Sequence, residues 1–183
     1  VLEVKLNNVE LSSRWYPGGG LYRPVKLILS GESAIDTWGV SITTPEVSES
    51  KATVQAQVAL REGSADGLEA QLEVLDAGGK AVASGRGQFS GGHLSHTLTL
   101  ERPALWSPES PSLYTLVTRV LGGGKVIDEN RTRFGVRSIA FSRENGFQLN
   151  GKTRKFKGVC LHHDLGPLGA AVNEAAISRQ IRI

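Results

Sequence analysis

Hydrophobic and polar residues alternate with a period of two along most of the chain, a pattern typical of strands that are buried on one face. The longest alternating run contains Ala52, Val54, Ala56, Val58 and Leu60. The next contains Leu68, Ala70, Leu72 and Val74. Shorter runs predict further strands at 40–42, 80–84, 94–100, 113–121 and 126–136.

Turn signals separate these runs. Residues 76–79 read Asp-Ala-Gly-Gly, and glycine clusters fall at 91–92 and 122–124. About seven short strands between residues 36 and 138, without a helical stretch, predict an antiparallel β-sandwich of about 100 residues. A cysteine pair is absent, so the sandwich is immunoglobulin-like in layout only. The fold class is therefore all-β, with a core predicted to contain Val54, Val58, Leu72, Val74, Leu98, Leu116 and Val120.

The two ends of the chain differ from its middle. Residues 1–30 carry two strand patterns, which cannot bury a face alone, so they form a remnant of a preceding domain or an edge of the sandwich. After residue 138, Asn150-Gly151 predicts a type I′ hairpin turn, and 156–161 predicts a buried strand. A helix is predicted over 173–183 with Asn173 as its N-cap. One strand and one helix do not complete a domain, so we expect the chain to be an internal fragment cut across a domain.

Composition excludes several classes of function. The net charge of +3 is scattered and aromatic residues make up only 6 %, which does not favour a nucleic-acid partner. No apolar stretch approaches the roughly 20 residues that span a bilayer, so no membrane partner is expected. The single cysteine, Cys160, is expected to be a small core residue, although a catalytic thiol stays possible because His162 and His163 follow it.

Three stretches together carry a resemblance to a known family. They are 13–23 (SRWYPGGGLYR), 105–116 (LWSPESPSLYTL), and 134–162, which begins FGVR and continues through FQLNG and KGV to His162. In this order and at this spacing, they resemble glycoside hydrolase family 2, which contains β-galactosidases, β-glucuronidases and β-mannosidases. The resemblance covers essentially the whole chain.

The resemblance implies three regions. Residues 1–33 would be the last strands of a jelly-roll sugar-binding domain, 34–138 the immunoglobulin-like sandwich, and 139–183 the start of a (β/α)₈ catalytic barrel. The parent would be a retaining β-glycosidase, with β-galactosidase as first choice, whose partners are a carbohydrate substrate and the rest of the barrel. The family's two catalytic glutamates would lie downstream, and Glu174 matches neither. The resemblance implies no metal site in this chain, and no cofactor is expected.

His162, His163 and Asp164 are the candidate substrate-binding residues. In a barrel enzyme, active-site groups lie at the carboxyl ends of the strands, and Leu161 ends the predicted strand. A neutral imidazole offers one donor and one acceptor to a sugar hydroxyl. The resemblance places His162 at the family's substrate-contacting histidine, with His163 where the family often has a glutamate. The alternative is that the histidine pair caps the loop by contacting backbone.

A second function class stays open. The chain could be a stand-alone β-sandwich module that binds carbohydrate or a partner protein. Such modules usually expose aromatic side chains as stacking platforms, whereas most aromatics here fall on strand or proline-flanked positions. Trp106, which precedes Ser107-Pro108, is therefore expected to be a core residue and not a sugar platform.

Overall fold

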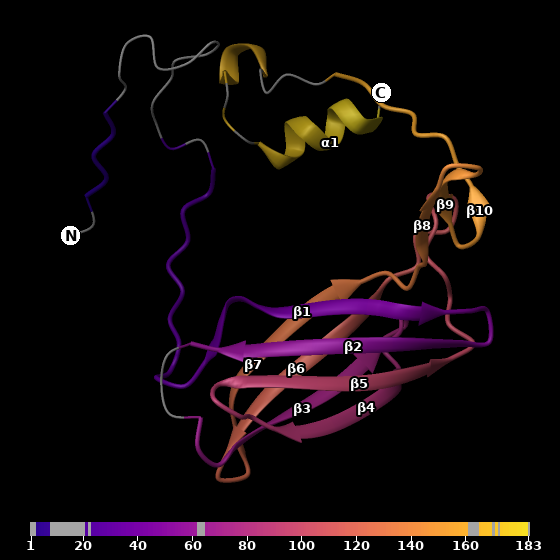
Figure 1. The fold of residues 1–183 in the computed structure, drawn as a ribbon. Helices are drawn as coiled ribbons and strands as arrows, with labels where there is room; N and C mark the ends of the chain where they lie inside the picture. Colours follow the sequence, from indigo (N-terminus) through magenta and orange to yellow (C-terminus); the bar gives the residue numbers. More distant parts are fainter. Residues whose placement is uncertain are drawn as a thin grey trace. The chain divides into compact units, whose positions relative to one another are not determined.

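A computed structural model describes residues 3–7, 21, 23–61, 65–160, 165–169, 171 and 173–182 of the 183-residue chain. The chain divides into two compact units (Figure 1). One is Leu29–Phe156, and the other combines Val1–Ile28 with Lys157–Ile183.

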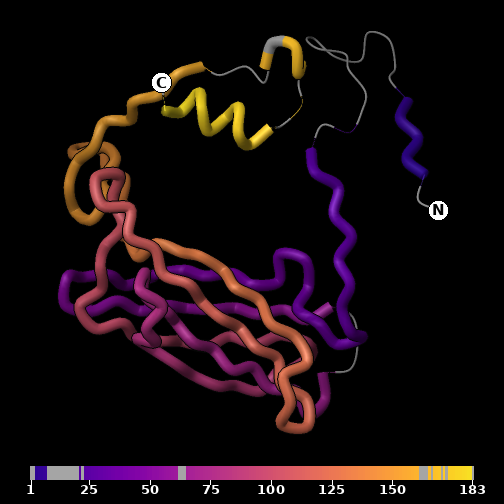
Figure 2. Tube along the Cα trace, turned by 180° about the vertical axis from the view of Figure 1, so that it is seen from behind, coloured from indigo at the N-terminus to yellow at the C-terminus, as the bar shows by residue number. Residues whose placement is uncertain are grey.

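The larger unit contains a two-layer sandwich of antiparallel strands (Figure 1). The first sheet has the order β1-β2-β5, formed by β1 (Ile35–Val47), β2 (Lys51–Leu60) and β5 (His93–Glu101). The second has the order β4-β3-β6-β7, formed by β3 (Leu68–Leu75), β4 (Ala81–Gln88), β6 (Tyr114–Gly122) and β7 (Lys125–Phe134). Figure 2 turns this second sheet toward the viewer. The arrangement confirms the predicted immunoglobulin-like sandwich.

The alternating pattern of the sequence places one set of side chains between the two sheets. In β3, buried and partly exposed residues alternate without exception from Leu68 to Leu75. All seven predicted core residues are at most 4 % exposed: Val54, Val58, Leu72, Val74, Leu98, Leu116 and Val120. Full burial of such a side chain contributes about 1.5–3 kcal/mol, so this layer is the main source of stability.

Short turns set the register of the hairpins. Gly122 pairs with Lys125, so Gly123 and Gly124 alone form the loop between β6 and β7. Their φ angles are +57° and +77°, a left-handed conformation that glycine adopts without a steric penalty. In the turn before β4, the Asp76 carboxylate accepts hydrogen bonds from the backbone N–H groups of Gly78 and Lys80, both at 2.9 Å.

A tyrosine fixes the crossing from β5 to β6. The backbone N–H of Ala104 donates a 2.8 Å hydrogen bond to the Tyr114 hydroxyl, which lies at the start of β6. The Tyr114 ring packs beside Phe134 with centroids 5.8 Å apart. This contact has the form of the tyrosine corner found in immunoglobulin-like sandwiches. It holds the segment before β6 against the end of the second sheet where β6 begins.

A small third sheet follows the sandwich within the same unit. Its order is β10-β9-β8, formed by β8 (Ile139–Ser142), β9 (Gly146–Leu149) and β10 (Lys152–Thr153). Leu149 pairs with Lys152, so Asn150 and Gly151 form a two-residue turn with φ angles of +49° and +72°. These values confirm the predicted type I′ turn.

The ends of the chain correct three expectations. Residues 3–7 and 23–30 form no strand, and Leu27 and Leu29 are each 86 % exposed. The predicted strand at 156–161 is also absent over its described residues, 156–160, where Val159 is 90 % exposed. Cys160 is exposed and is not a core residue. The common reason is that a strand pattern forms a strand only where a neighbouring strand satisfies its backbone groups.

The smaller unit contains the described helices. A 3₁₀ turn spans Gly166–Leu168, and α1 spans Glu174–Arg182. The backbone N–H of Ala176 donates a 3.1 Å hydrogen bond to the Asn173 side-chain oxygen, which confirms Asn173 as the N-cap.

One buried polar atom in the core generates a stability prediction. Thr118 is fully buried, and its hydroxyl has no hydrogen-bond partner among the described residues. Because a buried hydroxyl without a partner is destabilising, Thr118→Val should raise the free energy of unfolding by about 1 kcal/mol. Urea unfolding of both proteins measures the difference. Thr115→Val, on the partly exposed outer face of β6, is the control. A loss of stability specific to Thr118→Val would contradict this assignment.

Candidate functional site

The sequence-predicted site residues His162, His163 and Asp164 lie outside the described residues. Their nearest described neighbours in the chain are Cys160 on one side and Leu165 on the other. The structure thus places none of the three beside another group, and they stay a prediction. What the structure does describe is the segment that leads to this loop, beginning where the chain leaves the sandwich.

The chain leaves the sandwich at a junction built around Trp106. The backbone N–H of Trp106 donates a 2.8 Å hydrogen bond to the carbonyl oxygen of Val136, and Leu105 forms a parallel bridge with Val136. A side chain at Gly135 would approach the Trp106 Cβ and Cγ to 2.9 Å, so only glycine fits there. The segment after β7 is therefore held directly against the Trp-Ser-Pro segment.

Arg137 continues this contact. Its guanidinium lies 5.0 Å from the centre of the Trp106 ring, a cation–π geometry. Its carbonyl oxygen accepts a 3.0 Å hydrogen bond from the Thr44 hydroxyl of β1. Trp106 is half-buried between these groups and lies outside the main core. The expectation that it is a core residue is therefore wrong, and its contacts give it a structural role at the junction.

Asn150 joins the third sheet to the same junction. Its side-chain N–H donates a 3.0 Å hydrogen bond to the Trp106 carbonyl oxygen, and its side-chain oxygen accepts a 3.0 Å hydrogen bond from the Ser138 N–H. Its own backbone N–H donates to the Ser138 carbonyl oxygen at 2.9 Å. One residue in a hairpin turn thus connects three segments: the Trp106 segment, the start of β8 and the β9–β10 turn.

An ion pair adds a second connection between these segments. The guanidinium of Arg154, directly after β10, donates two hydrogen bonds to the two carboxylate oxygens of Glu109, with Nη2 at 2.9 Å from Oε2. Arg154 holds the pKa of Glu109 below its ordinary value of 4.5. The pair is exposed to solvent, so it orients β10 more than it stabilises the fold.

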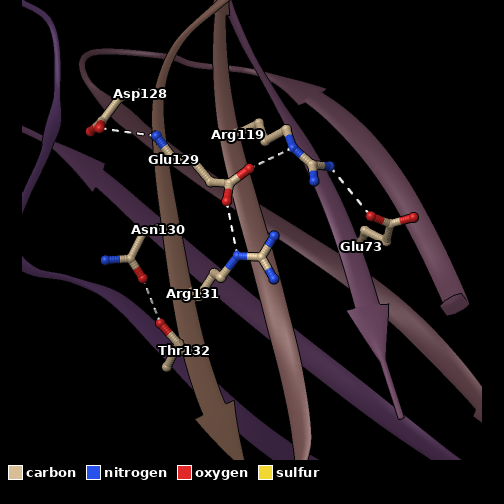
Figure 3. Close-up of polar contacts among 7 residues, drawn as sticks. All are labelled: Glu73, Arg119, Asp128, Glu129, Asn130, Arg131 and Thr132. Carbon is tan, nitrogen blue, oxygen red and sulfur yellow. Dashed lines mark hydrogen bonds and ion pairs between the residues drawn. The ribbon is translucent and has the colours of Figure 1, made fainter. Parts of the chain in front are cut away.

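A second charged group lies on the outer face of the four-stranded sheet. Arg119 contacts Glu129 at 2.8 Å and Glu73 at 3.3 Å, and Arg131 also contacts Glu129 at 2.9 Å (Figure 3). The two arginines, Arg131 first, hold the pKa of Glu129 below its usual range. Both carboxylates are paired with arginines on the partly exposed outer face of the sheet. The network therefore has the character of a stabilising contact between neighbouring strands.

Other kinds of site find no support in the part of the chain that the structure describes. Within it, no three histidine, cysteine or acidic side chains gather as metal ligands. The described helices also include none with the length and apolar character needed to cross a membrane.

The comparisons with known proteins give a consistent result. Residues 35–137 match the family model described as "Glycosyl hydrolases family 2". A putative β-glucuronidase of Formosa agariphila is 40 % identical over 165 residues, which are 90 % of this chain and 16 % of that protein. The β-galactosidase BoGH2A of Bacteroides ovatus is 38 % identical over 191 residues, covering 100 % of this chain and 22 % of that protein. The chain thus spans about a sixth to a fifth of the length of these relatives.

Solved structures agree. A glycosyl hydrolase family 2 member from Bacteroides cellulosilyticus matches 92 % of this chain with a TM-score of 0.86 and 39 % identity, over 24 % of its own length. A β-glycosidase from Bacteroides vulgatus matches 92 % of this chain with a TM-score of 0.83 and 32 % identity, over 22 % of its own length.

Sequence reasoning missed the contacts of Asn150 and the Glu109–Arg154 pair. It identified Asn150 only as a turn residue. An asparagine side chain can bond backbone groups near a turn, which is the only local signal for its role. The two residues of the ion pair are 45 positions apart, so nothing in their local sequence indicates that they meet.

The junction generates a prediction for Asn150. Asn150→Ala removes two side-chain hydrogen bonds and places alanine at a positive φ, so it should destabilise the β8–β10 sheet by about 2 kcal/mol. Limited proteolysis should then cut within 139–154 faster than in the original protein, while NMR signals of the sandwich strands stay in place. Asn145→Ala, on the exposed β8–β9 turn, is the matched control. Equal proteolysis of the two variants would contradict this role of Asn150.

The ion pair generates a pH prediction. The pKa of Glu109 is lower in the folded protein than in the unfolded chain, so the carboxylate contributes stability above pH 4.5 and loses it as pH falls through the folded pKa. Proteolysis within 139–154 should therefore accelerate as pH falls below 4.5, using an acid-active protease. Glu109→Gln should remove this acid sensitivity, and Glu144→Gln, on the exposed β8–β9 turn, should keep it. Identical pH profiles for both variants would contradict the assignment.

Proposed function

The chain belongs to glycosyl hydrolase family 2, and from this membership we propose that it forms the non-catalytic sandwich and the first barrel segment of a retaining β-glycosidase. The match of residues 35–137 to the family, on a sandwich with the expected core, carries the proposal. In this proposal, residues 1–33 come from the sugar-binding domain, 34–138 are the sandwich and 139–183 begin the catalytic barrel.

The proposed reaction is hydrolysis of an O-glycosidic bond with retention. Such an enzyme uses one carboxyl group as acid and base and a second, about 5 Å away, as nucleophile. Both would come from the barrel beyond this chain. This chain would contribute His162, with His163 and Asp164 beside it, as hydrogen-bonding groups for the hydroxyls of the bound sugar.

We expect β-galactosidase activity, with a β-galactoside as the first choice of substrate. The B. ovatus β-galactosidase is 38 % identical to the chain in an alignment that covers 100 % of this chain, which supports this choice. β-Glucuronidase is the second candidate, because the F. agariphila relative with that provisional name is 40 % identical over 90 % of the chain. The two substrates differ by a carboxylate, so a nitrophenyl β-galactoside and a nitrophenyl β-glucuronide distinguish them.

The junction explains what the sandwich would do for such an enzyme. Active-site groups have to be held within a fraction of an ångström of their working positions, which requires rigid support. The contacts of Trp106, Arg137 and Asn150 fix the β8–β10 sheet to the sandwich. That sheet directly precedes the segment 156–164, so the junction would limit where the His162 loop can start.

A pair of activity assays tests the proposal. The 183-residue chain should hydrolyse neither nitrophenyl substrate, because it cannot place two carboxylates on either side of a sugar. The same chain joined to its complete barrel should hydrolyse the galactoside. In that longer protein, His162→Ala should lower kcat/KM by about 100-fold, or about 3 kcal/mol of transition-state binding, with little change in stability.

Two results would contradict the proposal. Activity of the 183-residue chain alone would show that it holds its own catalytic groups. Unchanged kinetics of His162→Ala, with Ser142→Ala on the exposed surface of β8 as the control, would return His162 to a role in capping its loop. Faster hydrolysis of the glucuronide than of the galactoside would select the second substrate class.

A further inference from the structure

Trp38 is the most exposed large hydrophobic side chain in the described part of the chain, with 95 % of its surface accessible. Its backbone has a φ of +63°, a region that bulky residues rarely occupy because Cβ crowds the backbone. A tryptophan held exposed at a conformational cost is an outlier whose persistence suggests a function.

The local geometry shows what holds Trp38 in place. Ile35 pairs with Leu60 and Val40 pairs with Val58, so residues 36–39 of β1 lie opposite Ala59 alone. This enlarged bulge directs the segment out of the regular pairing of the sheet. Gly39 is required within it, because a Cβ there would lie 2.5 Å from the Ala59 carbonyl oxygen. The backbone at Gly39 is therefore closely packed against Ala59 of β2. The exposure of Trp38 is not the result of loose packing.

Trp38 lines an open groove of about 560 Å³ on the outer face of the β1-β2-β5 sheet. The polar side chains of the groove are Ser41, Gln57, Ser90, His93 and Ser95. Among the described residues, no aspartate, glutamate, lysine or arginine lines it. The groove thus combines one large aromatic surface with hydroxyl, amide and imidazole groups that both donate and accept hydrogen bonds.

The uncharged character extends from the groove into the next row of the sheet. Adjacent strands pair Ser41 with Gln57 and Gln57 with Ser95 in one row. The next row joins Thr43, Gln55 and Thr97 in the same way. The outer face of the opposite sheet carries the arginine–glutamate network instead (Figure 3). The two faces of the sandwich therefore differ in chemistry. Within the part of the chain that the structure describes, only the β1-β2-β5 face combines an exposed aromatic ring with neutral hydrogen-bonding groups.

We propose that this groove binds an uncharged saccharide, with the Trp38 indole as the stacking surface for a sugar ring. A pyranose has an apolar face of C–H groups and a rim of hydroxyl groups, which match the indole and the surrounding Ser, Gln and His side chains. An anionic ligand would require a cation in the lining, and an apolar peptide would require a broader apolar surface. The proposal goes beyond the glycosidase function and does not depend on it, since it concerns the sandwich alone.

Calorimetric titration of the 183-residue chain tests the proposal, with β-1,4-linked galactohexaose and cellohexaose as neutral probes and hexagalacturonate as the anionic probe. At least one neutral probe should bind, and hexagalacturonate should not. Trp38→Ala should weaken that binding by about tenfold or more, because stacking on the ring is lost. Trp38→Phe should retain part of it. Phe141→Ala removes another exposed aromatic, in β8, and should leave the affinity unchanged.

Three results would overturn the proposal. The first is that neither neutral probe binds. The second is that Trp38→Ala and Phe141→Ala bind the probe equally well. The third is a concentration-dependent rise in sedimentation coefficient that Trp38→Ala abolishes, without saccharide binding, which would assign the groove to a protein contact. Because Trp38 is almost fully exposed, its substitution removes little buried surface and these variants should fold.

Discussion

The burial of one alternating set of apolar side chains between two sheets is the constraint on which the rest of the structure depends. Val54 and Val58 from one sheet meet Leu72 and Leu116 from the other, and all four are at most 1 % exposed. A slip of one residue in any of these strands would exchange its buried and exposed sets, so burial also fixes the register. The register in turn decides which side chains form the two outer faces.

The junction around Trp106 extends the fixed structure of the sandwich to the β8–β10 sheet. The chain passes from β7 through Val136 and Arg137, both bonded to neighbouring segments, before β8 begins. The Asn150 side chain then connects the third sheet to Trp106 by a hydrogen bond. Each contact is modest alone, since a typical hydrogen bond contributes about 1 kcal/mol, but together they connect segments that are far apart in sequence. In the proposed function, these contacts would hold the start of β8 in a fixed place against the sandwich.

The parts that the sequence predicted well are those with local causes. The sandwich strands, the core and the Asn150-Gly151 turn follow from periodicity and backbone preference, and the structure confirms them. The strand expected at 156–161 is wrong over its described residues because a strand needs neighbours that sequence pattern cannot supply. The Asn150 contacts and the bulge at Trp38 depend on partners in distant segments, which no local pattern reveals. His162, His163 and Asp164 stay predictions from family resemblance.

The central claim is that the sandwich and the β8–β10 sheet form one ordered structure that ends before residue 157. Residue-resolved amide hydrogen exchange of the 183-residue chain tests this claim most directly. The account predicts the slowest exchange in β2, β3 and β6, intermediate protection in β8 and β9, and no protection at residues 157–160, which pair with no strand in the structure. Protection at 157–160 equal to that of β3 would contradict it, because those residues would then belong to the same cooperative core.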